Sequence, residues 1–334
     1  MFYQATAILT SIVIRVSRSA GITSCCLLAF LALQCLPFKL TAAAQPGAFV
    51  FIFSGQSPAY ERVANAAEKF ITEDCVSTKV DCNQLTFKRL TTEEVNAETI
   101  NNAYLSISLG TRATDWIQHE SFHGKQINAM LPYPLHTNEQ EEDGRSIAKI
   151  FIDQPYSRYF DLIKAMIPRS VRVGLLIHES NLDQLASISE SAKQHELILK
   201  PSVVSSERNV GEALSYLLDD IDVLLALPDA RIHNSQTISH ILTTAYRNNL
   251  PVVGFSSAYV KAGATAAVYT SPEDIAHQIA DTVIEYLLTQ HVVNDRQQAS
   301  YFSISFNFEV ARSLGLPPLS PSEIKQKISR DIIK

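Results

Sequence analysis

The chain has few of the residues that break regular structure: 11 glycines and 14 prolines among 334 residues. No stretch is of low complexity, and no internal repeat of solenoid length occurs. With 46% hydrophobic residues, this composition excludes a generally disordered protein. The length suffices for one large or two medium globular domains.

Cysteine is also scarce. Three of the five cysteines, Cys25, Cys26 and Cys35, lie in an apolar N-terminal segment. The other two, Cys75 and Cys82, form a close pair in EDCVSTKVDCN. A zinc site would need two more ligands nearby, and none stands out. We therefore expect a disulfide that closes a small loop in an oxidising compartment.

The N-terminal segment is typical of a secretory signal peptide. Arg15 and Arg18 precede an apolar run over residues 20–37, and the small residues of LTAAAQ follow. We expect a signal peptide over residues 1–44, cleavage before Gln45 and delivery to the periplasm. The apolar run is also long enough to span a bilayer, so an uncleaved anchor is the alternative.

Basic residues are under-represented in the rest of the chain. Residues 1–44 hold three basic residues and no acidic one, which leaves 25 basic against 34 acidic residues, a net charge of −9. An acidic exported protein is a poor candidate for binding nucleic acid or an anionic membrane surface.

Short apolar runs alternate with longer segments of helical periodicity through the first half of the mature chain. The expected strands are 48–55, 85–90, 104–110 and 126–133, and the expected helices are 57–74, 91–103 and 111–123. This alternation predicts a parallel sheet that is covered by helices on both faces.

After an acidic segment the pattern restarts. The expected strands are 147–155, 171–178, 197–204, 222–230 and 250–257, and the expected helices are 156–168, 181–196, 207–221 and 234–249. A long helix follows over 271–288, with Ser271 as N-cap and Pro272 in its first turn, and a strand and short helix close the chain in 301–318. The sequence thus predicts two Rossmann-like α/β lobes joined by a hinge near 153–156, with a ligand cleft at the carboxyl ends of the strands.

Three segments resemble ABC-transporter substrate-binding proteins of the tryptophan/tyrosine-type group. They are the strand end Leu227-Pro228-Asp229, the stretch LPVVGFSSAYVKAGA with Gly254 and Gly263, and FNFEVARSLGL with Asn307, Ala311, Leu314 and Gly315. In the first half, SLGTRATDW is similar to a G-T-x-A segment of the family. In place of the asparagine expected after Asp229 the chain has Ala230 and then Arg231.

The resemblance implies the type 1 periplasmic-binding fold, in which the chain crosses between its lobes more than once. The implied N-terminal lobe is 45–154 plus about 268–298, and the implied C-terminal lobe is 155–267 plus about 299–334.

One motif favours a different function. The stretch HESFH places His119 and His123 four residues apart around Glu120, as in zinc peptidases, and Glu142 is at the spacing of a third ligand. However, LPYPL lies between the two parts and cannot be helical throughout, as a zinc-peptidase fold requires. We favour a solvated helix end here and keep the zinc peptidase as an alternative.

Polar and aromatic residues gather at the expected strand ends, where a ligand would bind. Arg112 could pair with an anionic group, Asp229 could accept from an ammonium, and the tyrosines could stack on an apolar part. The candidate ligand-binding residues are Ser54, Gln56, Ser57, Tyr60, Thr111, Arg112, Tyr133, His178, Ser180, Asp229, Phe255 and Ser256.

No catalytic signature supports an enzyme: neither a G-x-S-x-G elbow at Ser57 nor a G-x-x-x-x-G-K-[ST] phosphate loop is present. We expect an exported, monomeric binding protein without a cofactor, which captures an amino-acid-like solute for an ABC permease. A sensor or partner protein that uses the same fold for signalling is the second candidate.

Overall fold

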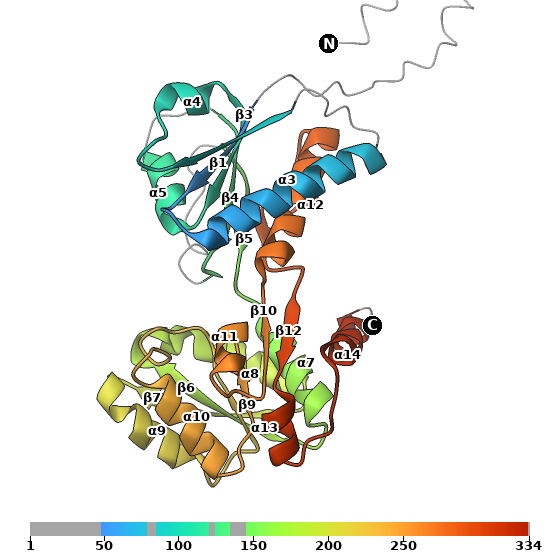
Figure 1. The fold of residues 1–334 in the computed structure, drawn as a ribbon. Coiled ribbons are helices and arrows are strands. Elements are labelled where there is room, and N and C mark those ends of the chain that lie inside the picture. Colours follow the sequence, from blue (N-terminus) through green and yellow to red (C-terminus); the bar gives the residue numbers. More distant parts are fainter. Residues whose placement is uncertain (1–47, 79–84, 120–123, 134–144, 333–334) are drawn as a thin grey trace, which may run out of the picture. The chain divides into compact units, whose positions relative to one another are not determined.

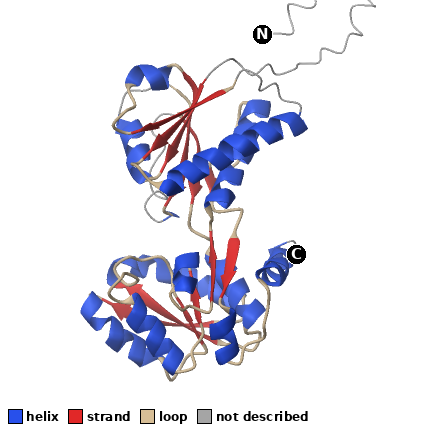
Figure 2. Ribbon diagram, viewed as in Figure 1, coloured by secondary structure: helices blue, strands red, loops and turns tan. Residues whose placement is uncertain are grey.

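The computed structural model describes residues 48–78, 85–119, 124–133 and 145–332, which form two α/β lobes (Figure 1). Each lobe is built on one six-stranded sheet that helices cover (Figure 2). The predicted fold class is therefore confirmed. Within the described residues, no helix combines the length and the apolar character needed to span a bilayer.

The first sheet is entirely parallel, with the strand order β11-β5-β4-β3-β1-β2. Its strands are β1 (Ala48–Phe53), β2 (Thr86–Thr91), β3 (Ala103–Leu109), β4 (Gln126–Leu131), β5 (Ser146–Phe151) and β11 (Arg296–Gln297). Its helices are α3 (Pro58–Thr78), α4 (Ala97–Asn101), α5 (Thr111–His119) and α12 (Pro272–Thr289).

The core of this lobe explains why its sequence is so apolar. The run from Phe49 to Ile52 on β1 is fully buried, because helices cover both faces of a parallel sheet. α3 and α12 pack together, and apolar residues at helical spacing, such as Val63 and Ala67 on α3 and Ile279 and Val283 on α12, belong to one core.

The second sheet has the order β12-β10-β9-β8-β6-β7, parallel except for β12, which runs antiparallel to β10. Its strands are β6 (Arg172–His178), β7 (Ile198–Val204), β8 (Val223–Leu225), β9 (Val252–Gly254), β10 (Ala266–Tyr269) and β12 (Ser303–Phe306). The helical elements are α7 (Tyr156–Met166), η1 (Glu179–Gln184), α8 (Leu185–Gln194), η2 (Glu207–Asn209), α9 (Val210–Leu217), α10 (Ile238–Arg247), α11 (Ser257–Lys261), α13 (Phe308–Ser313) and α14 (Pro321–Ile332).

Two expected helices begin later than the sequence indicated. The helix expected over 181–196 starts as the 3₁₀ turn η1, and α8 proper begins at Leu185. The helix expected from Asn234 begins at Ile238, because the Asn234 side chain accepts hydrogen bonds from the amides of Gln236 and Thr237 and holds a separate turn. The amphipathic helix α14, which packs against α7, was not predicted.

The chain passes between the two sheets three times: after β5, after β10 and after β11. Three side chains, Gln154, Arg158 and Thr270, tie these passages together, and we call them the crossing cluster. Gln154 Nε2 donates to Thr270 Oγ1 at 2.6 Å and to the carbonyl of Tyr301 at 3.2 Å. Arg158 donates to Gln154 and, at 2.7 Å, to the carbonyl of Ala299.

The cap of α12 gives a first prediction. Ser271 accepts from the amide of Asp274 at 3.1 Å, and Asp274 accepts in return from the amide of Ser271 at 2.9 Å, as predicted for Ser271. We expect Ser271→Ala to lower the free energy of unfolding by about 1 kcal/mol, measured by urea denaturation. The control is Ser313→Ala, an exposed serine bonded within its own helix. An equal loss in both variants would contradict the capping role.

Candidate functional site

The carboxyl end of β1 is held by hydrogen bonds within the first lobe. Ser54 Oγ donates to the carbonyl of Leu109 at 2.9 Å and accepts from the amide of Ala113 at 2.9 Å, while its own amide donates to Leu109. Ser54 was expected to contact a ligand. Its polar groups join the end of β3 to the first turn of α5, and its contact with a ligand stays a prediction.

Gly110 allows this close approach. It has a φ of +90°, and a Cβ atom there would lie 2.6 Å from the hydroxyl of Tyr60 and 2.7 Å from Ser54 Oγ. Tyr60 stacks on Phe53 with ring centroids 6.0 Å apart. The candidate Tyr60 thus packs over the turn that follows β3.

The next two candidates lie at the start of α5. Thr111 is its first residue and is partly buried. Arg112 is exposed and pairs with Glu93 at 3.3 Å. Because both side chains of this pair are more than half exposed, its contribution to stability is small.

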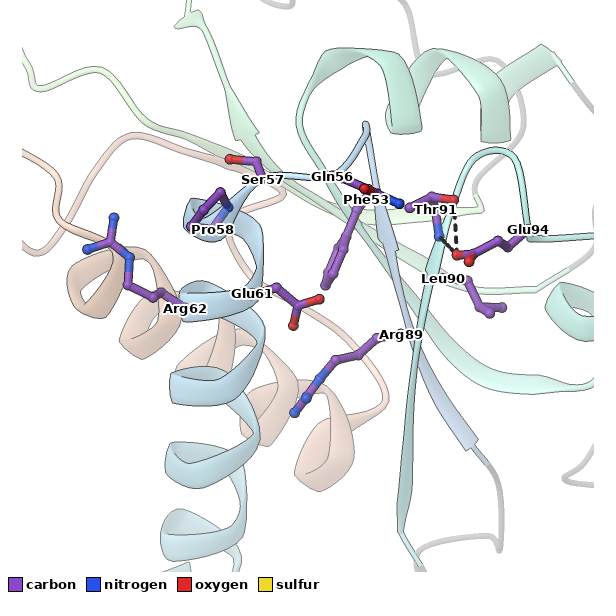
Figure 3. A pocket seen from close by; sticks show the side chains of 10 residues that line it. All are labelled: Phe53, Gln56, Ser57, Pro58, Glu61, Arg62, Arg89, Leu90, Thr91 and Glu94. Carbon is purple, nitrogen blue, oxygen red and sulfur yellow. Dashed lines mark hydrogen bonds between the residues drawn. The ribbon is translucent and has the colours of Figure 1, made fainter.

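Gln56 and Ser57 line an open hollow of about 740 Å³ between α3 and β2. Ser57 also accepts from the amide of Ala59 at 3.3 Å, at the start of α3. Figure 3 shows Glu61 and Arg89 pointing into the hollow from the helix and the strand. Arg89 pairs with Glu68 further along α3. Opposite charges thus already face each other along this hollow.

In the second lobe, Asp229 does not present a free carboxylate. Its Oδ1 accepts from the backbone amide and Nε of Arg231, each at 2.9 Å. Its Oδ2 accepts from Nη2 of Arg231 and from Asn181 Nδ2, also at 2.9 Å. Burial alone would raise the pKa of Asp229, but the hydrogen bonds and charge of Arg231 outweigh it and hold that pKa below its usual value.

Two further candidates join this network. Arg231 Nη1 donates to Ser180 Oγ, and His178 Nδ1 lies 2.9 Å from the same oxygen. His178 also caps η1 by accepting from the amide of Ser180 at 3.2 Å. The sequence therefore identified His178, Ser180 and Asp229 as neighbours, but it missed Arg231, which binds them together.

A cavity of about 530 Å³ adjoins this network and is largely apolar. Its lining consists of Pro132, Tyr133, Asp153, Gln154, Pro155, Tyr156, Tyr159, Asn181, Gln184, Leu227, Pro228, Asp229, Ala230, Arg231 and Gln298. The volume is within the range of small-molecule sites in proteins. Two of the predicted residues, Tyr133 and Asp229, line it.

Asp153 is the most unusual group in this cavity. It follows β5, where its Oδ2 accepts from the amide of Tyr133 at 2.8 Å, while its other oxygen has no hydrogen-bond partner among the described residues. Burial raises the pKa of Asp153, and the hydrogen bond from Tyr133 offsets this only in part. Burial together with the charges of neighbouring carboxylates, Asp153 first among them, raises the pKa of Tyr156 to about 12.

A second cavity of about 350 Å³ shares Asp153, Gln154, Tyr159 and Pro228 with the first. Phe255 and Ser256 line it, as expected for the end of β9. The hydroxyl of Ser256 accepts from the amide of Tyr259 at 3.1 Å and caps α11. Asp153 therefore borders both cavities.

The strand-end rule that selected the candidates could also have found Asp153, which follows the expected strand in IFIDQP. In the sequence Arg231 stood out only as a departure from the family pattern, and Asn181 gave no signal, because their roles depend on the turn around Asp229. The zinc hypothesis lies largely outside the described residues: Glu120, His123 and Glu142 are not among them, and His119 ends α5. Within the described ranges, no group of three metal-binding side chains occurs.

Comparisons with known structures reveal the same fold. A domain from Streptococcus pneumoniae in complex with L-Trp matches with a TM-score of 0.54 at 15% identity, over 84% of this chain and 98% of the other. The ligand-free, open structure of a substrate-binding protein with adhesive properties from Clostridium difficile matches with a TM-score of 0.64 at 14% identity, over 83% and 97%.

Sequence comparison gives a curated relative and a family. The relative is a tyrosine-binding protein of Clostridioides difficile (strain R20291), 24% identical over 169 residues. The match covers 49% of this chain and 48% of that protein, so the chain spans about half the length of the relative. The family model of ABC transporter substrate-binding proteins matches residues 137–316, more than half of the chain. Members of this family bind a substrate and are not enzymes, and the chain belongs to it.

Proposed function

We propose that this protein is an exported solute-binding protein that captures a small amino-acid-like ligand for an ABC-type importer. The observation that carries the proposal is the cavity around Asp153, where a partly buried carboxylate with one unpaired oxygen lies among tyrosine side chains. A ligand that fills the cavity would cover this oxygen, and a donor group on the ligand would then satisfy it. Its place beside the crossing cluster supports a ligand that is enclosed when the lobes move about the hinge.

The family adds support for the importer, and the relatives support the ligand class. One solved relative holds L-Trp, and a curated relative is a tyrosine-binding protein. The aromatic and apolar lining of the cavity suits such a ligand. We further propose that residues 1–44 are removed on export and that Cys75, buried on α3, forms a disulfide with Cys82, which lies outside the described residues.

Native mass spectrometry of the protein purified from the periplasm tests this proposal. We expect a small organic mass that is released on denaturation, an N-terminus at Gln45, and an intact mass lacking two thiol hydrogens. Ala230→Trp, which fills the cavity, should lose the organic mass, whereas Ala186→Trp on the exposed face of α8 should keep it.

Other outcomes would separate the alternatives. Retention of the ligand by Ala230→Trp would place the site elsewhere. A complex with another protein, formed equally by Ala230→Trp and the unchanged protein, would favour the sensor. Stoichiometric zinc that is lost in His119→Ala would favour the peptidase.

A further inference from the structure

The charges that line the two cavities do not balance. Among the lining residues that the structure describes, the acidic groups are Asp153 and Asp229, and the single basic group is Arg231. Because Arg231 already neutralises Asp229 through its Nε and Nη2, the carboxylate of Asp153 is the unmatched charge. A ligand that restores neutrality here carries a net positive charge.

Arg158, the basic residue that donates to the lining residue Gln154, does not supply this charge. Its guanidinium donates to the carbonyl of Ala299 and to Gln154, and it lies over the ring of Phe302. The charged neighbours that act on Arg158 are Asp161 and Asp274. Asp153 has the amide of Tyr133 as its described partner.

The surroundings of Asp153 also suit a ligand that has both a positive charge and an aromatic ring. Tyr133, Tyr156 and Tyr159 line the same cavity as the unpaired carboxylate oxygen. The hydroxyl of Tyr156 donates to Gln184 at 2.8 Å, which fixes that ring against the wall. Tyrosine ring faces attract ammonium groups and stack on aromatic groups, so the ligand's charge and its apolar part can both be held here.

The described lining offers few donors and no unpaired positive charge to a carboxylate on the ligand. Three of the five N–H groups of Arg231 already donate to Asp229 or Ser180, and the amide of Asn181 donates to Asp229. Gln184 and Gln298 supply neutral side chains only. Bringing a carboxylate into a cavity whose unmatched charge is already negative costs free energy without a matching ion pair.

We propose that Asp153 holds the ammonium group of the ligand, and that the preferred ligand is an aromatic monocation, an amine that lacks the carboxylate of an amino acid. This inference rests on the proposed function and narrows its ligand class. Arg231 then acts as the residue that excludes zwitterions, because it withdraws Asp229 from ligand binding.

Isothermal titration calorimetry with three probes that share one ring tests the inference. The probes are tyramine, L-tyrosine and 3-(4-hydroxyphenyl)propionate, titrated into the exported protein after retained ligand has been removed. We expect tyramine to bind at least about 10-fold more tightly than L-tyrosine, and the propionate to bind most weakly of the three.

Two variants identify the groups responsible. Asp153→Asn, which keeps the shape of the side chain, should weaken tyramine binding by about 10-fold or more. Arg231→Gln frees the largely buried Asp229 and should leave tyramine binding equal or tighter. Arg312→Gln removes an exposed pair with Glu309 outside both cavities and should change nothing.

The results distinguish this inference from the proposed function. If L-tyrosine binds more tightly than tyramine and Arg231→Gln weakens it, Arg231 binds the ligand's carboxylate; the inference is then wrong and the solute-binding function stands. Unchanged tyramine binding in a folded Asp153→Asn variant also overturns the inference. If none of the three probes binds the unchanged protein, both proposals fail.

Discussion

Arg158→Met is expected to lower the free energy of unfolding by about 3 kcal/mol, because it leaves buried acceptors of the crossing cluster without their donor. Arg158 is only 7% exposed and donates to the carbonyl of Ala299, which lies in the third passage between the sheets. It also donates to Gln154, whose amide holds Thr270 and the carbonyl of Tyr301. Methionine keeps an unbranched apolar stem in the core but supplies no donor.

Urea denaturation measures this loss. The control is Arg169→Met, because Arg169 is exposed in the loop between α7 and β6. The control should change the free energy of unfolding by no more than about 0.5 kcal/mol. A double-mutant cycle with Gln154→Leu should give a coupling energy of about 1 kcal/mol or more. A loss no larger than that of the control would mean that the crossing cluster does not join the three passages.

The crossing cluster also marks the limit of what the sequence could predict about the fold. The run AFVFIF and the Ser271-Pro272 start of α12 are local signals, and β1 and α12 formed where these patterns placed them. The partners of Gln154 and Arg158 lie 116 to 147 residues away in the chain. No local pattern specifies such contacts, because they exist only after both sheets have formed. The lobe bounds implied by the family resemblance remain a prediction.

The candidate site, too, could be predicted only in part from the sequence. Parallel strands place their carboxyl ends at one edge of a sheet, and this rule located Tyr133, Asp229, Phe255 and Ser256 along the two cavities. The rule locates residues but does not show which polar groups stay available. Ser54 and Asp229 are engaged within their own lobes, whereas Asp153 keeps one oxygen open.

Acid is expected to destabilise this protein through His233. This side chain is 7% exposed, its Nδ1 lies 3.1 Å from the hydroxyl of Tyr259, and its ring packs against Phe255. Burial lowers the pKa of His233 to about 4, and the charge of Asp229 opposes this only in part. In the unfolded chain a histidine titrates near its ordinary pKa of about 6.5.

Between these two pKa values the unfolded chain binds a proton that the folded protein does not. The free energy of unfolding therefore falls as the pH falls from about 6.5 towards 4, by about 2 kcal/mol between pH 7 and pH 4.5. His233→Phe keeps a ring in the core and should remove this part of the pH dependence, although it costs about 1 kcal/mol at pH 7 because Tyr259 loses its partner.

Urea denaturation at pH 7 and pH 4.5 of the unchanged protein, of His233→Phe and of His240→Gln measures the effect. His240 is exposed on α10, so its replacement should leave the difference between the two pH values unchanged. Because other groups titrate equally in all three proteins, the comparison isolates His233. If His233→Phe shows the same difference in the free energy of unfolding between pH 7 and pH 4.5 as the unchanged protein, the acid sensitivity arises from other groups. The folded protein then does not keep His233 in its neutral form.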